Sequence, residues 1–502
     1  MTDTDRALPF WKRYPTLKLV GLFTGPLAFL LLALGPTIEG LPPEGQAAAA
    51  ITLLMAIWWV TEAIPIYVTA LVPVILFPIT GVLSVGETTQ NYGHELIFLF
   101  LGGFLLAIAI EKWDLHRRIA LNIVSLFGTD PTRLVLGFMV ATGFLSMWIS
   151  NTASAMIMVP IGLAVIAEMT KLLGQKSPEV DTSPGQFPFG MALMLGIGYA
   201  ASVGGIATII GSPPNAIFVG YVSQIHDIDI SFFQWMLYGL PVAATGLVII
   251  WWYLTRIAHP IELEDSPELA DIITSQRRNL PPLEGPELRV LVIFIVVASL
   301  WVLRGVLAPV LGELGLGGLN DTTIAIFGAL LLFIIPANLG DKDFLLSWSD
   351  TRDLPWGILI LFGGGLALAG GIESSGLAAW LGEALHALEA APMVLVLGAI
   401  ALLVIFLTEV TSNTSTASIF VPIVAILATV IGVHPYILMI TVVTAASCAF
   451  MLPIATPPNA VVFASEYVTM KQMMKAGIWL NLTFVLLITL VGYFWLPLVW
   501  GL

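Results

Sequence analysis

The chain has 502 residues, of which 58% are hydrophobic and only 10% are charged, with a formal net charge of −14. Several apolar runs reach about 20 residues, the length that a helix needs to cross a bilayer core of roughly 30 Å. This composition excludes an ordinary soluble protein and predicts an all-α, polytopic membrane protein. The single cysteine, Cys448, excludes an intrachain disulfide, and no nucleic-acid partner is expected.

The apolar runs predict about eleven transmembrane segments and two re-entrant hairpins. In chain order, the expected spans are 18–37, 47–64, 66–83, 95–112, 190–222, 232–255, 288–310, 320–338, 355–373, 434–464 and 476–500, and the expected hairpins are 133–170 and 392–430. Amphipathic segments at 113–127 and 374–389 predict helices that lie along the membrane surface. The hydrophilic stretch 256–287 is interpreted as a cytoplasmic linker between two halves.

The positions of lysine and arginine predict the orientation. With the N-terminus in the cytoplasm and each hairpin returning to its starting side, every Lys and Arg except Arg304 falls on the cytoplasmic side, as the positive-inside rule requires. Arg304 lies within a span and is expected to extend its charged end to the membrane surface. The C-terminus is then outside, and the first hairpin starts from the cytoplasm while the second starts from outside.

A polar tripeptide is repeated in the two halves. Ser150-Asn151-Thr152 is followed by Pro160 in the first half. Ser412-Asn413-Thr414 is followed at the same distance by Pro422, and the two copies are 262 residues apart. Inverted repeats of this kind are typical of secondary transporters, which bind their substrate near the bilayer midplane where broken helices meet.

A second motif is also repeated. Gly211-Ser212-Pro213-Pro214-Asn215 stands in the first half and Ala455-Thr456-Pro457-Pro458-Asn459 in the second. Because proline lacks an N–H, the Pro-Pro pair breaks the helix and leaves the preceding carbonyls without helical partners. Free carbonyls and asparagine oxygens suit a cation such as Na⁺, whereas amides and the N-terminus of a half-helix suit an anion. The two halves therefore predict two cation sites that flank one anion.

Charged residues are nearly absent from these regions. Across 134–170 and 190–222 the only one is Glu168, and across 392–464 the only one is Glu409. No base is available to neutralise an anionic substrate, so cation dependence is a physical requirement of this interpretation. For Glu409 two interpretations stay open: a functional group, either a proton carrier or an aid to the second cation, or a structural carboxylate held by the hydroxyls of Thr408 or Thr411.

At these motifs, and over nearly its whole length, the chain resembles the divalent anion/sodium symporters, a family that transports di- and tricarboxylates. The resemblance implies a bacterial dicarboxylate transporter that is integral to the inner (plasma) membrane and forms a homodimer among membrane lipids. It also implies scaffold helices at 1–112 and 288–373. The surface helices, hairpins and transport helices would lie at 113–255 and 374–502 and would carry the site across the membrane in an elevator-type movement.

The resemblance also implies ligands, each of which this sequence provides. The first sodium site would use Ser146, Ser150, Asn151 and the Gly211 carbonyl. The second would use Thr408, the Thr411 backbone carbonyl, Asn413 and the Ala455 carbonyl. The substrate carboxylates would meet Asn151, Thr152, Ser212, Asn413, Thr414, Thr456 and Pro457.

The leading hypothesis is Na⁺-coupled uptake of a C4-dicarboxylate such as succinate, malate or fumarate, with Na⁺ as the co-transported ion. The alternatives are a sodium-independent dicarboxylate exchanger and a symporter for citrate or sulfate. An intramembrane hydrolase is disfavoured because no histidine accompanies Ser150 or Ser412, so no enzyme activity is expected. A channel is disfavoured by the inverted halves.

Overall fold

The computed structural model describes residues 15–502 except 129, 177–179, 227, 264–273, 314, 316–317, 339–342, 387–388 and 390. Helices dominate this part of the chain, and its only β-pairing is an isolated bridge between Pro336 and Phe344. The predicted all-α fold is confirmed. Much of the predicted linker, including Glu264 to Asp271, lies outside the described residues.

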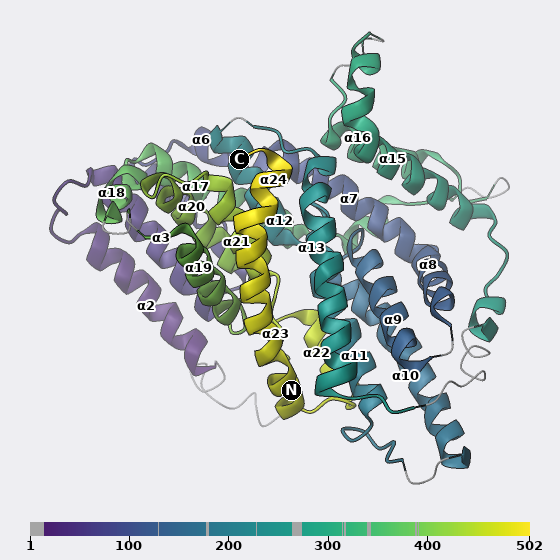
Figure 1. The fold of residues 1–502 in the computed structure, drawn as a ribbon. Coiled ribbons are helices and arrows are strands. Elements are labelled where there is room, and N and C mark those ends of the chain that lie inside the picture. Colours follow the sequence, from purple (N-terminus) through teal and green to yellow (C-terminus); the bar gives the residue numbers. More distant parts are fainter. Residues whose placement is uncertain are drawn as a thin grey trace, which may run out of the picture.

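The helices fall into two series along the chain (Figure 1), whose later parts have the same order. The first series is α2 (Thr16–Ala33), α3 (Pro43–Thr61), α4 (Ile66–Thr69), α5 (Val72–Thr80), α6 (Val85–Gln90), α7 (Glu95–Lys112), α8 (Leu115–Val124), α9 (Pro131–Ser146), α10 (Asn151–Lys176), α11 (Pro188–Gly204), α12 (Pro213–His226) and α13 (Phe232–Tyr253). The second series is α15 (Gly285–Glu313), α16 (Asp321–Ile334), α17 (Trp356–Ser374), α18 (Leu377–Ala384), α19 (Met393–Thr408), α20 (Asn413–Val430), α21 (Pro435–Ala446), α22 (Pro457–Phe463), α23 (Met470–Leu490) and α24 (Leu496–Trp500). The order from α7 to α13 recurs from α17 to α23.

The predicted hairpins and helix breaks are present. Helices α9 and α10 meet at the first Ser-Asn-Thr, and α19 and α20 meet at the second. The expected spans 190–222 and 434–464 are each interrupted before the Pro-Pro pair, into α11 with α12 and α21 with α22. The expected span 66–83 is also divided, into α4 and α5. Nine helices of the described chain are long and apolar enough to cross a membrane.

The broken helices lie at the centre of the molecule. Figure 1 shows α11, α12, α21 and α22 in the middle, with α2 at one edge and α15 at the opposite one. The apolar segment Pro188–Ala207, which contains α11, is entirely buried inside the molecule. In contrast, only 11% of the residues of α2 are buried. Close helix contacts rely on glycine: a Cβ added to Gly102 would lie 2.6 Å from the Ala325 backbone, and one added to Gly364 would lie 2.3 Å from the Ala70 carbonyl oxygen.

Polar contacts between distant segments agree with the predicted division into two sides. Lys18 pairs with Glu62, Lys112 with Asp350 and Arg118 with Glu287, and all six residues belong to the predicted cytoplasmic side. On the other side, Asn320 donates to Glu95 and the Trp380 indole to the Glu39 carbonyl. The charged end of Arg304 was expected to extend to the membrane surface. In the structure its guanidinium group pairs with Asp229 at 3.1 Å and with Asp321 at 3.2 Å.

Candidate functional site

The tip of the first hairpin is a compact polar cluster. Ser146 Oγ lies 2.5 Å from the Ala201 carbonyl oxygen and 2.6 Å from one end of the Asn151 amide. The same end of the amide lies 3.0 Å from the Gly211 carbonyl oxygen and 3.2 Å from that of Ala201. With nitrogen at this end, the two N–H bonds of the amide have all three oxygens within donating distance. With oxygen there, the cluster becomes a set of four oxygens, which suits a cation.

Two glycines make this convergence of backbones feasible. A Cβ added to Gly205 would lie 2.5 Å from Asn151 Oδ1 and 2.8 Å from the Gly211 carbonyl oxygen. A Cβ added to Gly211 would lie 2.6 Å from the Gly205 carbonyl oxygen and 3.0 Å from that of Ser146. Of the other predicted ligands, Ser150 is exposed and its hydroxyl accepts from the Ala153 N–H as a cap of α10.

The second hairpin repeats the arrangement. Thr408 Oγ1 lies 2.6 Å from Asn413 Oδ1 and 3.1 Å from the Ala446 carbonyl oxygen. Thr408 and Asn413 follow Ser146 and Asn151 by the same 262 residues that separate the tripeptides. The Thr411 hydroxyl is turned away into its own hairpin, where it bonds the Leu407 carbonyl and Thr416. This leaves the backbone carbonyl of Thr411 as its available ligand, as the resemblance implies.

The asparagine of each Pro-Pro-Asn motif donates to backbone carbonyls of the segment that precedes the Pro-Pro pair. Asn215 Nδ2 donates to the carbonyls of Gly205 and Thr208, at 2.9 and 2.7 Å. Asn459 Nδ2 donates to the carbonyls of Ala449 and Leu452, at 3.0 and 3.1 Å. Both asparagines are fully buried. These bonds satisfy carbonyls that the interrupted helix leaves free, a role that the sequence analysis missed although the repeated motif was the signal.

Glu409 is held by the second break, not by the hydroxyls that the structural interpretation expected. Its carboxylate accepts from the backbone N–H groups of Phe450, Met451 and Leu452 at 2.7 to 3.0 Å. It also accepts from Asn481 Nδ2 at 2.8 Å. All four of these partners are donors, an environment that matches an ionised carboxylate. Glu409 therefore fixes the backbone segment that leads to Ala455.

The two halves are joined at the breaks. Tyr199 OH donates to the Phe450 carbonyl at 2.7 Å, and Tyr238 OH lies 2.8 Å from Thr444 Oγ1. Ser212 Oγ of the first half lies 3.4 Å from Ser447 Oγ of the second. The predicted substrate residues lie on these same elements. Asn151, Thr152 and Asn413 are half-buried at the tips, Ser212, Thr414 and Thr456 are buried, and Pro457 is exposed at the start of α22.

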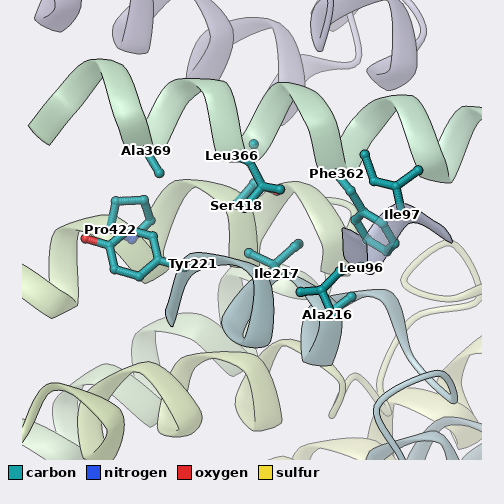
Figure 2. Close-up of a pocket in the computed structure, with 12 residues that line it drawn as sticks. Leu96, Ile97, Ala216, Ile217, Tyr221, Phe362, Leu366, Ala369, Ser418 and Pro422 are labelled. Carbon is teal, nitrogen blue, oxygen red and sulfur yellow. The ribbon is translucent and has the colours of Figure 1, made fainter. Parts of the chain in front are cut away.

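A mainly apolar cavity adjoins the predicted site. It lies between α12 and α20 on one side and α7 and α17 on the other (Figure 2). Ala216 follows Asn215 directly on α12, and Ser418 lies one turn beyond Thr414 on α20, so the cavity begins about one helical turn from the predicted ligands. None of the predicted ligands lines it. The cavity therefore belongs to the boundary between the predicted scaffold and transport helices.

Comparison with known proteins identifies the family. Residues 17–501 match the family model of the sodium:sulfate symporter transmembrane region. The chain is 46% identical over 493 residues to a sodium-dependent dicarboxylate transporter, SdcS, of Staphylococcus saprophyticus, covering 98% of this chain and 93% of the relative. It is also 46% identical over 491 residues to SdcS of Staphylococcus aureus strain MRSA252, with the same coverage.

Among solved structures, the crystal structure of the Alcanivorax borkumensis YdaH transporter resembles the fold. Its TM-score is 0.57 at 15% sequence identity, over 82% of this chain and 87% of YdaH. This likeness concerns the fold alone. The family model and the staphylococcal relatives span nearly the whole chain and carry the family assignment. The chain therefore belongs to the sodium:sulfate symporter family, the divalent anion/sodium symporters that its motifs resemble, and is a transporter rather than an enzyme.

Proposed function

We propose that this protein couples Na⁺ influx to the uptake of C4-dicarboxylates such as succinate, malate and fumarate. The observation that carries the proposal is the duplicated cluster at the hairpin tips, Ser146 with Asn151 and Thr408 with Asn413, in a region without lysine or arginine. A dianion placed between the tips has no fixed positive charge to meet. Co-bound cations supply that charge, which makes binding of anion and cation interdependent.

The first cation site would be formed when the Asn151 amide turns over. Its oxygen would then face Ser146 Oγ and the Gly211 carbonyl oxygen, at the 2.6 and 3.0 Å separations already present. Turning the amide also redirects its NH₂ group, which becomes available to a substrate carboxylate. Na⁺ binding would in this way prepare Asn151 for the anion. In the second half the Asn413 oxygen already faces Thr408 Oγ1, so its NH₂ group would be available without turning.

The substrate would lie between the tips and the breaks. Thr152 and Ser212 would donate to one carboxylate, and Thr414 and Thr456, with Pro457 beside them, would meet the other. The N-terminus of α12 would add a positive dipole end for the anion, although its Pro-Pro pair supplies no N–H groups. Two carboxylates flanked by two cations make the charges of the occupied site balance.

The transport movement would be of the elevator type. The proposed scaffold comprises residues 1–112 and 288–373, and the proposed moving part comprises 113–255 and 374–502. One observation supports this division. The apolar cavity has α12 and α20 of the proposed moving part on one side and α7 and α17 of the proposed scaffold on the other. We further propose a homodimer in the bacterial inner membrane, with the N-terminus cytoplasmic and the C-terminus outside.

Two alternatives differ from the proposal in a measurable way. The family description names sulfate, whereas the staphylococcal relatives are named for dicarboxylates, so sulfate is the main rival substrate. A sodium-independent exchanger is the rival mechanism.

The test is uptake of labelled succinate into liposomes that contain the purified protein, with Na⁺ outside, with K⁺ in its place, and with succinate preloaded. Na⁺-dependent uptake into empty vesicles, reduced by unlabelled malate and not by sulfate, is expected. Uptake only into preloaded vesicles and without regard to Na⁺ would establish exchange instead.

A further inference from the structure

A third repeated motif precedes the helix breaks. Ala200-Ala201-Ser202 ends α11, and Ala445-Ala446-Ser447 ends α21. The carbonyl of the second alanine faces the hairpin tip in both halves, toward Ser146 in one and Thr408 in the other. The two serines therefore occupy equivalent places, one residue beyond the contact with the proposed cation sites. Neither serine belongs to the ligand sets described above.

Ser447 touches the proposed substrate site of the opposite half. It is 1% exposed, and its hydroxyl lies 3.1 Å from the Val443 carbonyl oxygen and 3.4 Å from Ser212 Oγ. A serine hydroxyl has one proton to donate and can also accept. Ser447 can donate to Val443 while accepting from Ser212, or it can donate to Ser212. The second arrangement leaves the Ser212 proton free for a carboxylate.

Ser202 lies in the matching place beside the second break. A Cβ added to Gly198 would lie 3.5 Å from the Pro458 carbonyl oxygen, and Tyr199 bonds the Phe450 carbonyl. Ser202 follows these two residues by one helical turn on the same face of α11. It is 1% exposed, and its hydroxyl has no hydrogen-bond partner in the described part of the chain. The Ser202 hydroxyl therefore makes no hydrogen bond that could orient Thr456.

We propose that Ser447 is a positioning residue of the substrate site, which orients the Ser212 hydroxyl at the start of the broken half-helix of the opposite half. Ser202 has no such contact with Thr456 and is not assigned this role. The ligand that this arrangement serves is a carboxylate anion, and the inference rests on the proposed function. A chain of hydroxyls that ends on an anion polarises each bond in turn, so Ser447 strengthens a contact that it does not itself make.

The test is a double-mutant cycle on succinate transport by the reconstituted full-length protein. Ser447→Ala should raise KM for succinate about 3- to 10-fold, the equivalent of one hydrogen bond, while kcat stays within about twofold. The Na⁺ concentration for half-maximal rate, measured at saturating succinate, should not change. In a Ser212→Ala background, Ser447→Ala should have no further effect, because the hydroxyl that it orients is gone.

Thr441→Val is the matched control. Thr441 is buried on the same helix as Ser447, and its hydroxyl is used on the Ile437 carbonyl of that helix at 2.8 Å. It should leave KM unchanged. Additive effects of Ser447→Ala and Ser212→Ala on KM would overturn the proposal. Changes of equal size in kcat and KM, together with a lowered melting temperature, would also overturn it, because they would show a merely structural role.

Failure of the proposed function is a separate outcome. The cycle is run in parallel on binding of succinate, citrate and sulfate to the purified protein, measured by calorimetry in Na⁺. Binding of sulfate but not succinate by the unchanged protein would overturn the proposed substrate. The coupling between Ser447 and Ser212 would then be measured on the binding of sulfate. Binding of none of the three anions would overturn both proposals.

Discussion

At the scale of single residues, the first hairpin tip depends on a glycine as well as on its polar side chains. We predict that Gly211→Ala abolishes Na⁺-dependent transport, because its Cβ would lie 2.6 Å from the Gly205 carbonyl oxygen and push the two backbones apart. A clash with backbone cannot be relieved by a side-chain rotation. Initial rates in liposomes measure the effect. Gly174→Ala is the control, because nothing lies within 4 Å of the added Cβ, and a normal rate for Gly211→Ala would contradict the assigned geometry.

Glu409 gives a second prediction at this scale. Glu409→Gln places an amide where the carboxylate accepts four hydrogen bonds. At least one buried N–H then loses its acceptor, at a cost of about 1–3 kcal/mol. We expect a lower melting temperature and a several-fold higher Na⁺ requirement, since the segment leading to Ala455 is loosened. Glu168→Gln, at a solvent-exposed pair with Lys171, should change neither quantity. An unaltered Na⁺ dependence in Glu409→Gln would show that this carboxylate does not support the second cation site.

Which residues would form the site was largely predictable, whereas their partners were not. Repetition in the sequence marks Asn151, Asn413 and the Pro-Pro-Asn motifs, because the same chemistry is needed in both halves. It does not reveal that Glu409 accepts from residues about forty positions later, or that Ser212 meets Ser447 of the other half. Contacts of this kind depend on how the broken helices of the two halves pack against each other, which is set by packing over the whole molecule.

At the scale of elements, an ion-pair cluster joins α15 and α16 to the connection between α12 and α13. Arg304 pairs with both Asp229 and Asp321, and Asp321 also accepts from the Phe232 N–H at 2.7 Å. Trp301, one turn before Arg304, stacks on Phe232. The cluster therefore ties the proposed scaffold to the proposed moving part. Sequence reasoning placed Arg304 at the membrane surface but had no means of finding two aspartates distant in the chain.

We predict that Arg304→Gln destabilises the protein by several kcal/mol, because the buried Asp321 carboxylate loses its base. Asp229→Asn should cost about 0–1 kcal/mol, since Asp229 is largely exposed and its pair with Arg304 is screened by water. Thermal unfolding in detergent compares the two variants. An Arg304→Gln variant that melts at the same temperature as the unaltered protein would mean that the cluster contributes nothing to the link between α15 and α13.

At the scale of the whole molecule, the proposed elevator movement requires α20 to slide past α17. A Cβ added to Gly365 would lie 3.8 Å from Ser418 Cβ, a separation that a disulfide can bridge. In a Cys448→Ser background, we predict that Gly365→Cys with Ser418→Cys arrests transport on oxidation and that reduction restores it. Each single-cysteine variant is the oxidised control. Full transport by the cross-linked protein would show that these two helices do not move apart.

The broad architecture followed from the sequence because each of its features has a local cause. Apolar length gives spans, Pro-Pro gives breaks, and the inverted copies of Ser-Asn-Thr give two related halves. The division of 66–83 into α4 and α5 was not foreseen, because a continuous apolar run does not reveal where a helix bends.

The central claim is that two cation sites, one at each hairpin tip, are filled together with one dicarboxylate. The most direct measurement is the co-flux of radiolabelled sodium and succinate into the same liposomes. We predict that more than one Na⁺ enters with each succinate, and that Asn151→Ala and Asn413→Ala each weaken Na⁺ and succinate binding together by about tenfold or more. Asn122→Ala on the surface helix α8 is the control. Succinate entry without accompanying sodium, or full coupling in either asparagine variant, would contradict the account.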